Sequence, residues 1–427
     1  MQDIIAELNW RGLIHQTTDD AALRSRLAEH SVAVYAGFDP TADSLHVGHL
    51  VALMMLRRFQ RAGHRPIALV GGATGMIGDP SGKSEERNLL SLEALAHNVA
   101  SMQEQMRAFL DFGTGPTAAT LVNNYDWMRG FSYLDFLRDV GKNFPVNVML
   151  AKDSVRSRLE RTDSGLSFTE FSYMLLQAYD FVYLHRNHGC ELQIGGSDQW
   201  GNITAGIDLA RRMHAVQLYG ITCPLLTKSD GTKMGKTESG ALWLSPERTS
   251  PYKFYQYWIN VDDADAGKCL RFFTDLSREE IELLDAARST DPGRRESQRR
   301  LAEEITRLVH GEAGLAKAQR ASDILFGAEI ASLSDSELAE IFADVPSQEL
   351  DRGALAAGLN VIDAFVAAGL AKSKGEARRT ITQGGGYANN RRIASADATL
   401  TPADLASETV LVLRSGKKSY ALLRFRG

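Results

Sequence analysis

The sequence predicts an α/β protein whose first part is built on a parallel sheet. Two continuous apolar runs, at residues 31–35 and 66–70, have the composition of buried strands. Between them, residues 50–59 repeat apolar side chains at helical spacing, and this pattern ends at Gly63. Strand, helix and strand within about 40 residues form one βαβ unit, which predicts a Rossmann-like parallel sheet.

The elements around this unit are expected in the following order. Residues 1–30 have the pattern of one amphipathic helix, and residues 121–124 that of a third strand. Residues 125–190 are mostly helical in pattern and rich in Phe, Tyr, Leu and Met, so they form either an interior or a contact between two copies of the chain. Residues 192–194 predict a short strand, and residues 195–199 a turn into the next helix.

The second half of the sequence is expected to be helical first and mixed α+β at its end. Two short helices are expected at residues 361–370 and 374–382, and a hairpin at residues 409–425 around Ser415-Gly416. The expected domains are a parallel-sheet domain at 1–240 with a helical insertion at about 125–190, an α-helical domain at 241–343, a linker at 344–355 and a small α+β domain at 356–427.

Charge is unevenly distributed along the chain. The whole chain has a formal net charge of -5, yet residues 356–427 carry 11 Lys/Arg against 5 Asp/Glu. A basic C-terminal domain after an acidic body suggests that this domain binds a polyanion such as a nucleic acid.

Cysteine usage and hydropathy indicate the compartment. Cys190, Cys223 and Cys269 are widely spaced and form no CxxC, which argues against a disulfide framework and against a zinc site. The N-terminus lacks the apolar core of a signal peptide, and no apolar run reaches the ~18 residues that a membrane helix needs. We therefore expect a cytoplasmic protein without a membrane partner.

A histidine pair stands at the predicted start of the helix that follows the first strand. His46 and His49 lie about one turn apart, with Gly48 between them. A helix N-terminus favours anions, imidazoles donate hydrogen bonds to phosphate oxygens, and a glycine lets a flat ring approach the backbone. Two surface histidines beside a capping loop are the alternative. A metal site lacks a third ligand at a recognisable spacing.

A glycine-rich segment, residues 71–84, follows the second strand. It fails the P-loop pattern because position 77 is Ile, and it fails the dinucleotide fingerprint because position 73 is Ala. Five glycines directly after a buried strand still favour a close approach to a phosphate, with Lys83 and Arg87 beyond them. A flexible surface loop is the alternative.

Two further groups of polar residues point to a ligand site. Tyr173, Gln177 and Asp180 share one face of a predicted helix that is otherwise apolar, so they form either a satisfied core network or a pocket for a small polar ligand. Asp198 follows the strand at 192–194 at a βα junction, where it either binds ribose hydroxyls or caps the next helix.

The lysine motif Lys233-Met234-Gly235-Lys236-Thr237 follows the histidines by about 190 residues. HVGH and KMGKT together resemble the HIGH and KMSKS signatures of class I aminoacyl-tRNA synthetases. The stretches YAGFDPTADSLHVGH, GGATGMIGDPSGK, FTEFSYMLLQAYDF and LQIGGSDQWGNI are similar to those of bacterial tyrosyl-tRNA synthetases. The C-terminal domain resembles the RNA-binding domain named after ribosomal small-subunit protein four, so the resemblance covers essentially the whole chain.

The resemblance implies a tyrosine--tRNA ligase that makes tyrosyl-adenylate from L-tyrosine and ATP, releases pyrophosphate, and transfers tyrosine to the 3′-terminal adenosine of tRNA(Tyr). Residues implied to bind tyrosine are Tyr35, Asp79, Tyr173, Gln177, Asp180 and Gln199. Residues implied to bind ATP are Gly37, Asp39, His46, Gly48, His49, Gly196, Asp198 and Lys236. Residues implied to act around the departing pyrophosphate are Thr41, His46, His49, Lys83, Arg87, Lys233, Lys236 and Thr237.

The resemblance also implies partners. Mg²⁺ is expected to enter with ATP rather than at a dedicated protein site, and the chain is expected to be a homodimer joined through its helical insertion, with no DNA partner. Candidate phosphate contacts to tRNA are Lys372, Lys374, Arg378, Arg379, Arg391 and Arg392, with a solvated charged face as the alternative. Ala36 and Ala52 replace a cysteine and a threonine of some family members, which puts the nucleotide affinity in question.

Three competing functions are separable from this one. A tryptophanyl-tRNA synthetase shares the fold, but Tyr35 with Asp180 and the C-terminal domain argue against it. A small-molecule nucleotidyltransferase also uses HxGH, yet it needs neither a basic C-terminal domain nor a large helical middle. An RNA-binding protein derived from a synthetase would have lost catalysis, which the intact His46 and Lys233 argue against.

Overall fold

The computed structural model describes residues 3–79, 90–152, 155–156, 159, 166–237, 240–328, 330, 333–343, 345–416 and 419–426. The chain forms two compact units. Unit one consists of Met1–Thr249 and Tyr257–Val309, and unit two of Ser250–Gln256 and His310–Gly427.

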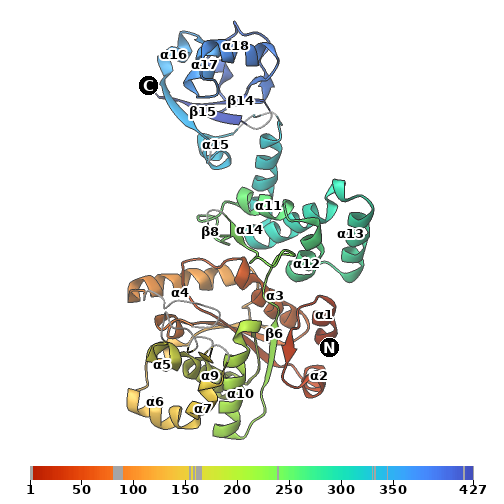
Figure 1. Ribbon diagram of the computed structural model, residues 1–427, viewed down its shortest axis with the longest axis vertical. Helices are drawn as coiled ribbons and strands as arrows, with labels where there is room; N and C mark the ends of the chain where they lie inside the picture. The colour runs from red at the N-terminus through yellow and green to blue at the C-terminus, as the bar shows by residue number, and fades with distance from the viewer. Residues whose placement is uncertain are drawn as a thin grey trace. The chain divides into compact units, whose positions relative to one another are not determined.

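A six-stranded sheet is the centre of unit one (Figure 1). Its order is β1-β6-β5-β2-β3-β4, and every pair is parallel except β1 with β6. The strands of unit one are β1 (Gln16–Thr17), β2 (Ala33–Phe38), β3 (Arg65–Val70), β4 (Thr120–Asn123), β5 (Cys190–Gly196), β6 (Tyr219–Cys223), β7 (Lys236–Thr237) and β8 (Gly240–Ala241). The predicted parallel sheet is therefore confirmed.

Helices pack against this sheet. The helix α3 contacts β2 and β3, while α9 and α10 contact β5. The helices of unit one are α1 (Ile4–Trp10), α2 (Asp20–Glu29), α3 (Val47–Arg61), α4 (Leu92–Met106), α5 (Tyr125–Met128), α6 (Tyr133–Asp139), α7 (Val146–Leu150), α9 (Phe168–His188), α10 (Trp200–His214), α12 (Asp263–Phe273) and α13 (Arg278–Thr290). Two more helices, α11 (Pro251–Ile259) and α14 (Glu296–Leu325), contribute residues to both units.

The prediction of one helix over residues 1–30 is wrong. Two helices, α1 and α2, flank the short edge strand β1. Gly12 has a φ of +73°, which ends the first helical segment, and the Asp19 carboxylate accepts a hydrogen bond from the Ala22 amide to cap the second. Apolar periodicity alone did not reveal this break.

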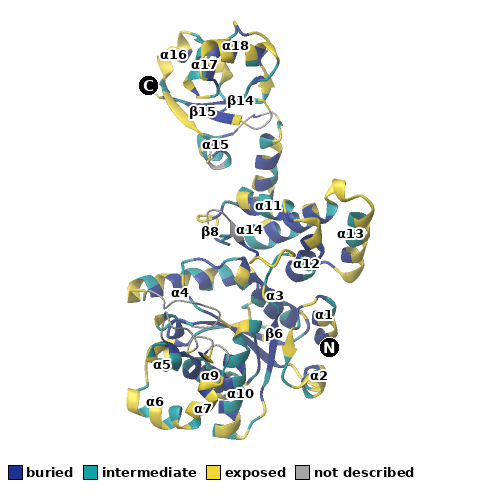
Figure 2. Cartoon of the chain, in the orientation of Figure 1, coloured by how far each residue is buried: buried dark blue, intermediate teal, exposed yellow. Residues whose placement is uncertain are grey.

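The long helix α9 carries three of the predicted site residues. A capping box between Ser167 and Glu170 starts it, and Gly189 in the left-handed region ends it. Its buried face joins a core that includes Phe181, Leu209 and the β2 residue Tyr35. Figure 2 shows β6, another strand of this sheet, mostly in dark blue, the colour of buried residues. The packing fixes the direction in which the polar side chains on the neighbouring face point.

Unit two contains a five-stranded sheet of order β12-β11-β14-β15-β9 and a two-stranded sheet of β10 with β13. Its strands are β9 (Ser347–Asp351), β10 (Leu359–Asn360), β11 (Gly386–Ala388), β12 (Arg391–Arg392), β13 (Thr399–Leu400), β14 (Val410–Ser415) and β15 (Ser419–Arg426). Its further helices are α15 (Asp335–Ile341), α16 (Arg352–Ala356), α17 (Val361–Ala367) and α18 (Lys374–Thr382). The predicted helix pair and terminal hairpin are confirmed.

The prediction of a linker at residues 344–355 is wrong. Ser347–Asp351 form the edge strand β9, which pairs in parallel with β15, and α16 follows it. Most of β9 is exposed, so its polar composition resembles that of a linker. The expected boundary at residue 343 also divides a core, because Leu338 and Phe342 pack in one cluster with Val412 and Leu422.

Among the described residues, no helix is long and apolar enough to cross a membrane.

Candidate active site

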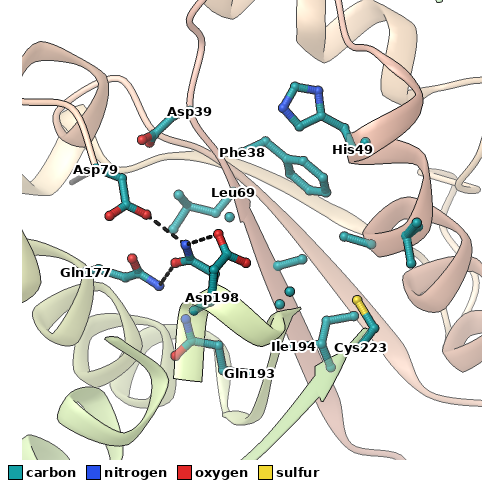
Figure 3. Close-up of a pocket in the computed structure, with 18 of the residues that line it drawn as sticks. Phe38, Asp39, His49, Leu69, Asp79, Gln177, Gln193, Ile194, Asp198 and Cys223 are labelled. Atoms are coloured by element: carbon teal, nitrogen blue, oxygen red, sulfur yellow. Dashed lines mark hydrogen bonds between the residues drawn. The ribbon is translucent and has the colours of Figure 1, made fainter. Parts of the chain in front are cut away.

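A cavity of about 370 Å³ opens at the carboxyl ends of β2, β5 and β6 (Figure 3). In the sheet, β2 lies between β3 and β5, so the chain turns to opposite sides of β2 as it continues. Such a switch point is where open parallel sheets bind ligands. The predicted site residues that line the cavity are Tyr35, Gly37, Asp39, His46, Gly48, His49, Asp79, Tyr173, Gln177, Asp180, Gly196, Asp198 and Gln199.

The histidine pair forms one side of the cavity at the start of α3. The two rings stack with centroids 3.8 Å apart. The amide of Gly48 donates to Nδ1 of His46, and the amide of His46 donates to Nδ1 of His49. Because both Nδ1 atoms accept, the proton of each neutral ring lies on Nε2. Burial lowers the pKa of His46, so this ring is a neutral donor.

The amides at the start of α3 have partners inside the protein. Val47 donates to the carbonyl of Leu242, and His49 donates to that of His46. A phosphate at this helix end would therefore meet imidazole donors rather than amides. Gly48 is required by the ring of His46, because a Cβ at position 48 would lie 2.8 Å from its Cε1.

Asp180 and Tyr35 form a buried polar pair at the inner end of the cavity. Asn124 Nδ2 and Trp127 Nε1 donate to the two Asp180 oxygens at 3.0 and 2.9 Å. Burial raises the pKa of Asp180 to about 7, although these two hydrogen bonds oppose the shift. The hydroxyl of Tyr35 is buried and has no partner among the described residues. A ligand hydroxyl is the group that would complete both residues.

Asn124 and Trp127 were missed by the sequence analysis. They follow β4 directly, at the same carboxyl edge of the sheet as the cavity. That position is the signal that could have found them. Gln193, also missed, lines the cavity from β5 with its side-chain oxygen buried and without a partner among the described residues.

A hydrogen-bonded chain of carboxylates and amides crosses the middle of the cavity. Gln199 donates to Asp79 at 2.8 Å and to Asp198 at 3.4 Å, and Gln177 donates to Gln199 at 3.3 Å. Figure 3 shows Asp79, Gln177 and Asp198 turned toward one another. Burial raises the pKa of Asp198, the hydrogen bond from Gln199 lowers it, and the ammonium of Lys233 lowers it further. Several carboxylates suit a cationic ligand group and ribose hydroxyls.

Asp39 links the two groups of predicted residues. It was expected on the nucleotide side, yet it accepts a hydrogen bond from Tyr173, which was expected on the tyrosine side, at 3.0 Å. Thr74 donates to its other oxygen at 2.9 Å. Asp39 therefore lies where the two groups meet.

The described part of the glycine-rich segment does not form a phosphate cradle. The amides of Gly72 and Ala73 donate to Asn123 and Asn124, and the amide of Gly75 donates to a backbone carbonyl. This part contributes the side chains of Thr74 and Asp79 to the cavity instead. Lys83 and Arg87 lie outside the described residues.

The lysine loop meets the histidine helix through its backbone. Leu242 donates to the carbonyl of Gly235 and accepts from the amide of Val47, which starts α3. Gly235 has a φ of +81°, where a Cβ would lie 3.2 Å from that of Val47, so glycine fits here better than serine. Lys233 is exposed and does not line the cavity, but its charge acts on Asp198.

Other predicted residues remain apart from the cavity. Thr41 is exposed and does not line it. The side chains of Lys236 and Thr237 lie outside the described part of the chain, although their backbone forms β7. Ala36 and Ala52 both line the cavity, in agreement with positions that face a nucleotide or amino acid.

Comparison with known proteins decides the family. Residues 27–327 match the family described as "tRNA synthetases class I (W and Y)", and residues 337–423 match the "Tyrosine--tRNA ligase SYY-like C-terminal domain". The chain is 61% identical over 424 residues to the tyrosine--tRNA ligase of Rhodopirellula baltica, covering 99% of this chain and 96% of the relative. It is 52% identical to that of Geobacillus stearothermophilus, covering 99% and 100%.

The chain belongs to the tyrosine--tRNA ligase family.

Solved structures agree with membership in this ligase family. A C-terminally truncated mitochondrial tyrosyl-tRNA synthetase of Aspergillus nidulans superposes with a TM-score of 0.69 at 33% identity, covering 76% of this chain and 95% of that one. The tryptophanyl-tRNA synthetase of Plasmodium falciparum, at 15% identity and a TM-score of 0.53, shares the fold alone. The chain is an aminoacyl-tRNA ligase, and the tryptophan alternative is less supported.

Within unit two, all six residues predicted to contact tRNA are exposed. Lys374 pairs with Asp363 at 2.5 Å, and Arg378 pairs with Asp397 at 2.8 Å. Lys374 and Arg378 also line an open hollow between α17 and α18. The remaining four are Lys372, Arg379, Arg391 and Arg392.

Proposed function

We propose that this chain activates L-tyrosine with ATP to give tyrosyl-adenylate and pyrophosphate, and then esterifies the terminal adenosine of tRNA(Tyr). One observation carries the proposal. The same cavity has Asp180 and the buried Tyr35 hydroxyl, which lacks a partner among the described residues, at one end and two imidazole donors at a helix N-terminus at the other. A phenol and a phosphate chain are the groups that these two ends fit.

The phenol end would select the amino acid. The hydroxyl of bound tyrosine would donate to Asp180 and accept from Tyr35, so its oxygen would be satisfied on both sides. Phenylalanine would leave the buried Tyr35 hydroxyl without a partner and would offer no donor to Asp180, and a site of this kind rejects such an analogue strongly. Asp79, Tyr173 and Gln177 would hold the α-ammonium, supported by the bond from Gln199 to Asp79.

The first step needs alignment and positive charge rather than a general base. The carboxylate of tyrosine is already a nucleophile and attacks the α-phosphorus, while negative charge gathers on the departing pyrophosphate. His46 and His49 would donate from Nε2, and Lys233 and Lys236 would supply charge from the loop. Asp198 would hold ribose hydroxyls beside Gly196.

Mg²⁺ would enter with the β- and γ-phosphates and neutralise part of their charge. Among the described residues, no cluster of three His, Cys, Asp or Glu is placed to hold a metal ion. The carboxylates of the cavity are bonded to Gln199, Tyr173, Asn124 and Trp127 instead. These residues fit a metal that is carried by the nucleotide.

Unit two would bind tRNA through its exposed cations, since phosphate contacts position a nucleic acid without reading its sequence. Two copies of the chain would associate through the helical insertion. This second assignment is supported by apolar side chains on α6, α7 and α9 that are exposed in a single chain, among them Leu134 at 74% and Phe168 at 67%. The three free, buried cysteines suit a reducing cytoplasm.

Substitution of Asp180 by Ala tests the selectivity. We expect tyrosine-dependent ATP–pyrophosphate exchange to fall steeply and the preference for tyrosine over phenylalanine to collapse, measured as the ratio of kcat/KM values. A variant that still discriminates as the unaltered chain does would show that Asp180 is wrongly assigned.

A further inference from the structure

The lysine loop is a hairpin held from one side by another helix. Lys228 donates to the carbonyl of Thr232, Met234 donates to that of Leu226, and Thr227 bridges Lys233. Asp230 accepts from the amide and hydroxyl of Thr232 and closes the turn. Residues 226–234 therefore have a defined shape, and the direction of Lys233 depends on where this hairpin is seated.

The helix α12 holds the first strand of the hairpin with two charged side chains. Lys268 Nζ donates to the carbonyl of Thr227 at 2.9 Å, directly across the bridge from Lys233. Asp265 accepts from the amide of Ser229 at 2.8 Å and from its hydroxyl at 3.4 Å. Asp265 is 3% exposed, so the bond is shielded from water and holds its geometry.

The second strand of the hairpin is held beside α11 and α12. Met234 is buried, and its sulfur lies 3.5 Å from that of Cys269 on α12. The amide of Gly235 donates to the hydroxyl of Tyr257 on α11 at 2.8 Å. Lys233 is the exposed residue between these contacts on one side and the Thr227 bridge on the other.

The far end of α12 is fixed to the histidine helix. Arg58, near the end of α3, donates to the carbonyls of Arg271 and Thr274. Arg11 donates to the same two carbonyls, and both guanidinium groups are buried. The loop with Lys233 and the helix with His46 are thus connected through one helix as well as through the Leu242 backbone.

We propose that Asp265 and Lys268 are positioning residues for the first reaction step, because they set the place of the Lys233 ammonium relative to the pyrophosphate. The proposal rests on the role given above to Lys233. Neither residue lines the cavity, so tyrosine binding does not depend on them. Loss of the Asp265 or the Lys268 side chain leaves Lys233 in the chain but lets its ammonium occupy a wider range of positions. A smaller fraction of complexes is then correctly aligned, so the first step is slower.

The test uses single-turnover formation of tyrosyl-adenylate by the full chain, with rates normalised to active sites by burst titration. We expect Asp265→Ala and Lys268→Met each to slow this step by about 10-fold or more, with the Kd for tyrosine unchanged. Asp265→Asn and Lys268→Arg, which keep an acceptor for Ser229 and a donor for Thr227, recover most of the rate. Asp262→Asn is the matched control, because this exposed carboxylate at the same helix end makes no side-chain cap.

A double-mutant cycle with Lys233→Ala separates positioning from general destabilisation. If Asp265 acts through Lys233, Asp265→Ala costs much less in the Lys233→Ala chain than in the unaltered one. Equal costs in both chains, or no cost in the unaltered chain, overturn the proposal. If Lys233→Ala itself leaves the rate unchanged, the role of Lys233 fails instead, which is a separate and distinguishable result.

Discussion

Asp180 gives the prediction that the structure supports in most detail. Burial raises the pKa of its carboxyl to about 7 from the ordinary value of 3.8. A phenol that accepts from Tyr35 must donate its own hydrogen, and the ionised carboxylate of Asp180 accepts that hydrogen much more strongly than the neutral acid does. Protonated Asp180 would place a second donor against the phenol oxygen. We therefore expect tyrosine to bind mainly to the chain in which Asp180 has lost its proton.

The expected size of the effect comes from that pKa. With a pKa of about 7 in the unliganded chain, the ionised fraction falls from about nine-tenths at pH 8 to about one-tenth at pH 6. The affinity for tyrosine in the absence of ATP should fall about 10-fold over that interval, and about 100-fold by pH 5. Binding at pH 6 should release close to one proton.

Isothermal titration calorimetry between pH 5 and 8 measures both quantities, with two buffers of different ionisation enthalpy at each pH. Asp180→Asn is the control. The affinity of this variant for tyrosine is expected to be weak at every pH and not to change between pH 8 and 6. A Kd that stays constant from pH 8 to 6 in the unaltered chain would refute the reasoning. So would a slope that persists in Asp180→Asn.

The same group links stability to pH. Folding raises the pKa of Asp180, so the native state binds this proton more tightly than the unfolded chain. Stability is highest while the carboxyl is protonated and is lost as the pH rises through the native pKa. We expect the unliganded chain to lose roughly 3 kcal/mol from this group between pH 5 and 8. Urea unfolding of the unaltered chain and of Asp180→Asn isolates that difference, and parallel profiles would contradict it.

Three further predictions concern the lysine loop, the proposed association of two chains and the proposed binding of tRNA. Lys233→Ala is expected to slow adenylate formation about 100-fold while changing the Kd for ATP far less, as rapid-mixing kinetics would measure. Equal losses in the rate and in the ATP affinity would contradict the role of Lys233 in the reaction step. Leu134→Glu is expected to shift the sedimenting mass toward a single chain, whereas Leu283→Glu, equally exposed on α13, should leave it unchanged. Substitution of Lys372 and Arg379 by Ala is expected to raise the KM for tRNA several-fold and flatten its salt dependence, with tyrosine-dependent exchange unaltered; an unchanged KM would place the RNA elsewhere.

Much of the fold could be predicted because buried strands and the signature helix have strong local patterns. The run at 66–70 became β3, and the break at Asp39-Pro40 ended β2 at Phe38. Local patterns failed where an element is short or exposed. The edge strand β9 buries almost nothing, so its register against β15 is set by a partner more than 70 residues away.

The candidate site followed the same rule. Residues in the motifs, such as His46 and Asp198, lie in the cavity as expected. Asn124 and Trp127 could not be assigned from spacing, because their hydrogen bonds reach Asp180 across more than 50 positions of the sequence. The hydrogen bond from the Val47 amide to the Leu242 carbonyl also depends on a tertiary contact, which no sequence pattern specified.

The most direct test of the account is ATP–pyrophosphate exchange with each of the twenty amino acids in turn, in the presence of Mg²⁺. The account predicts exchange with tyrosine alone, since only a phenol completes both Tyr35 and Asp180. Exchange with tryptophan would keep the fold and contradict that pairing. A folded chain that exchanges with no amino acid would contradict the proposed reaction itself.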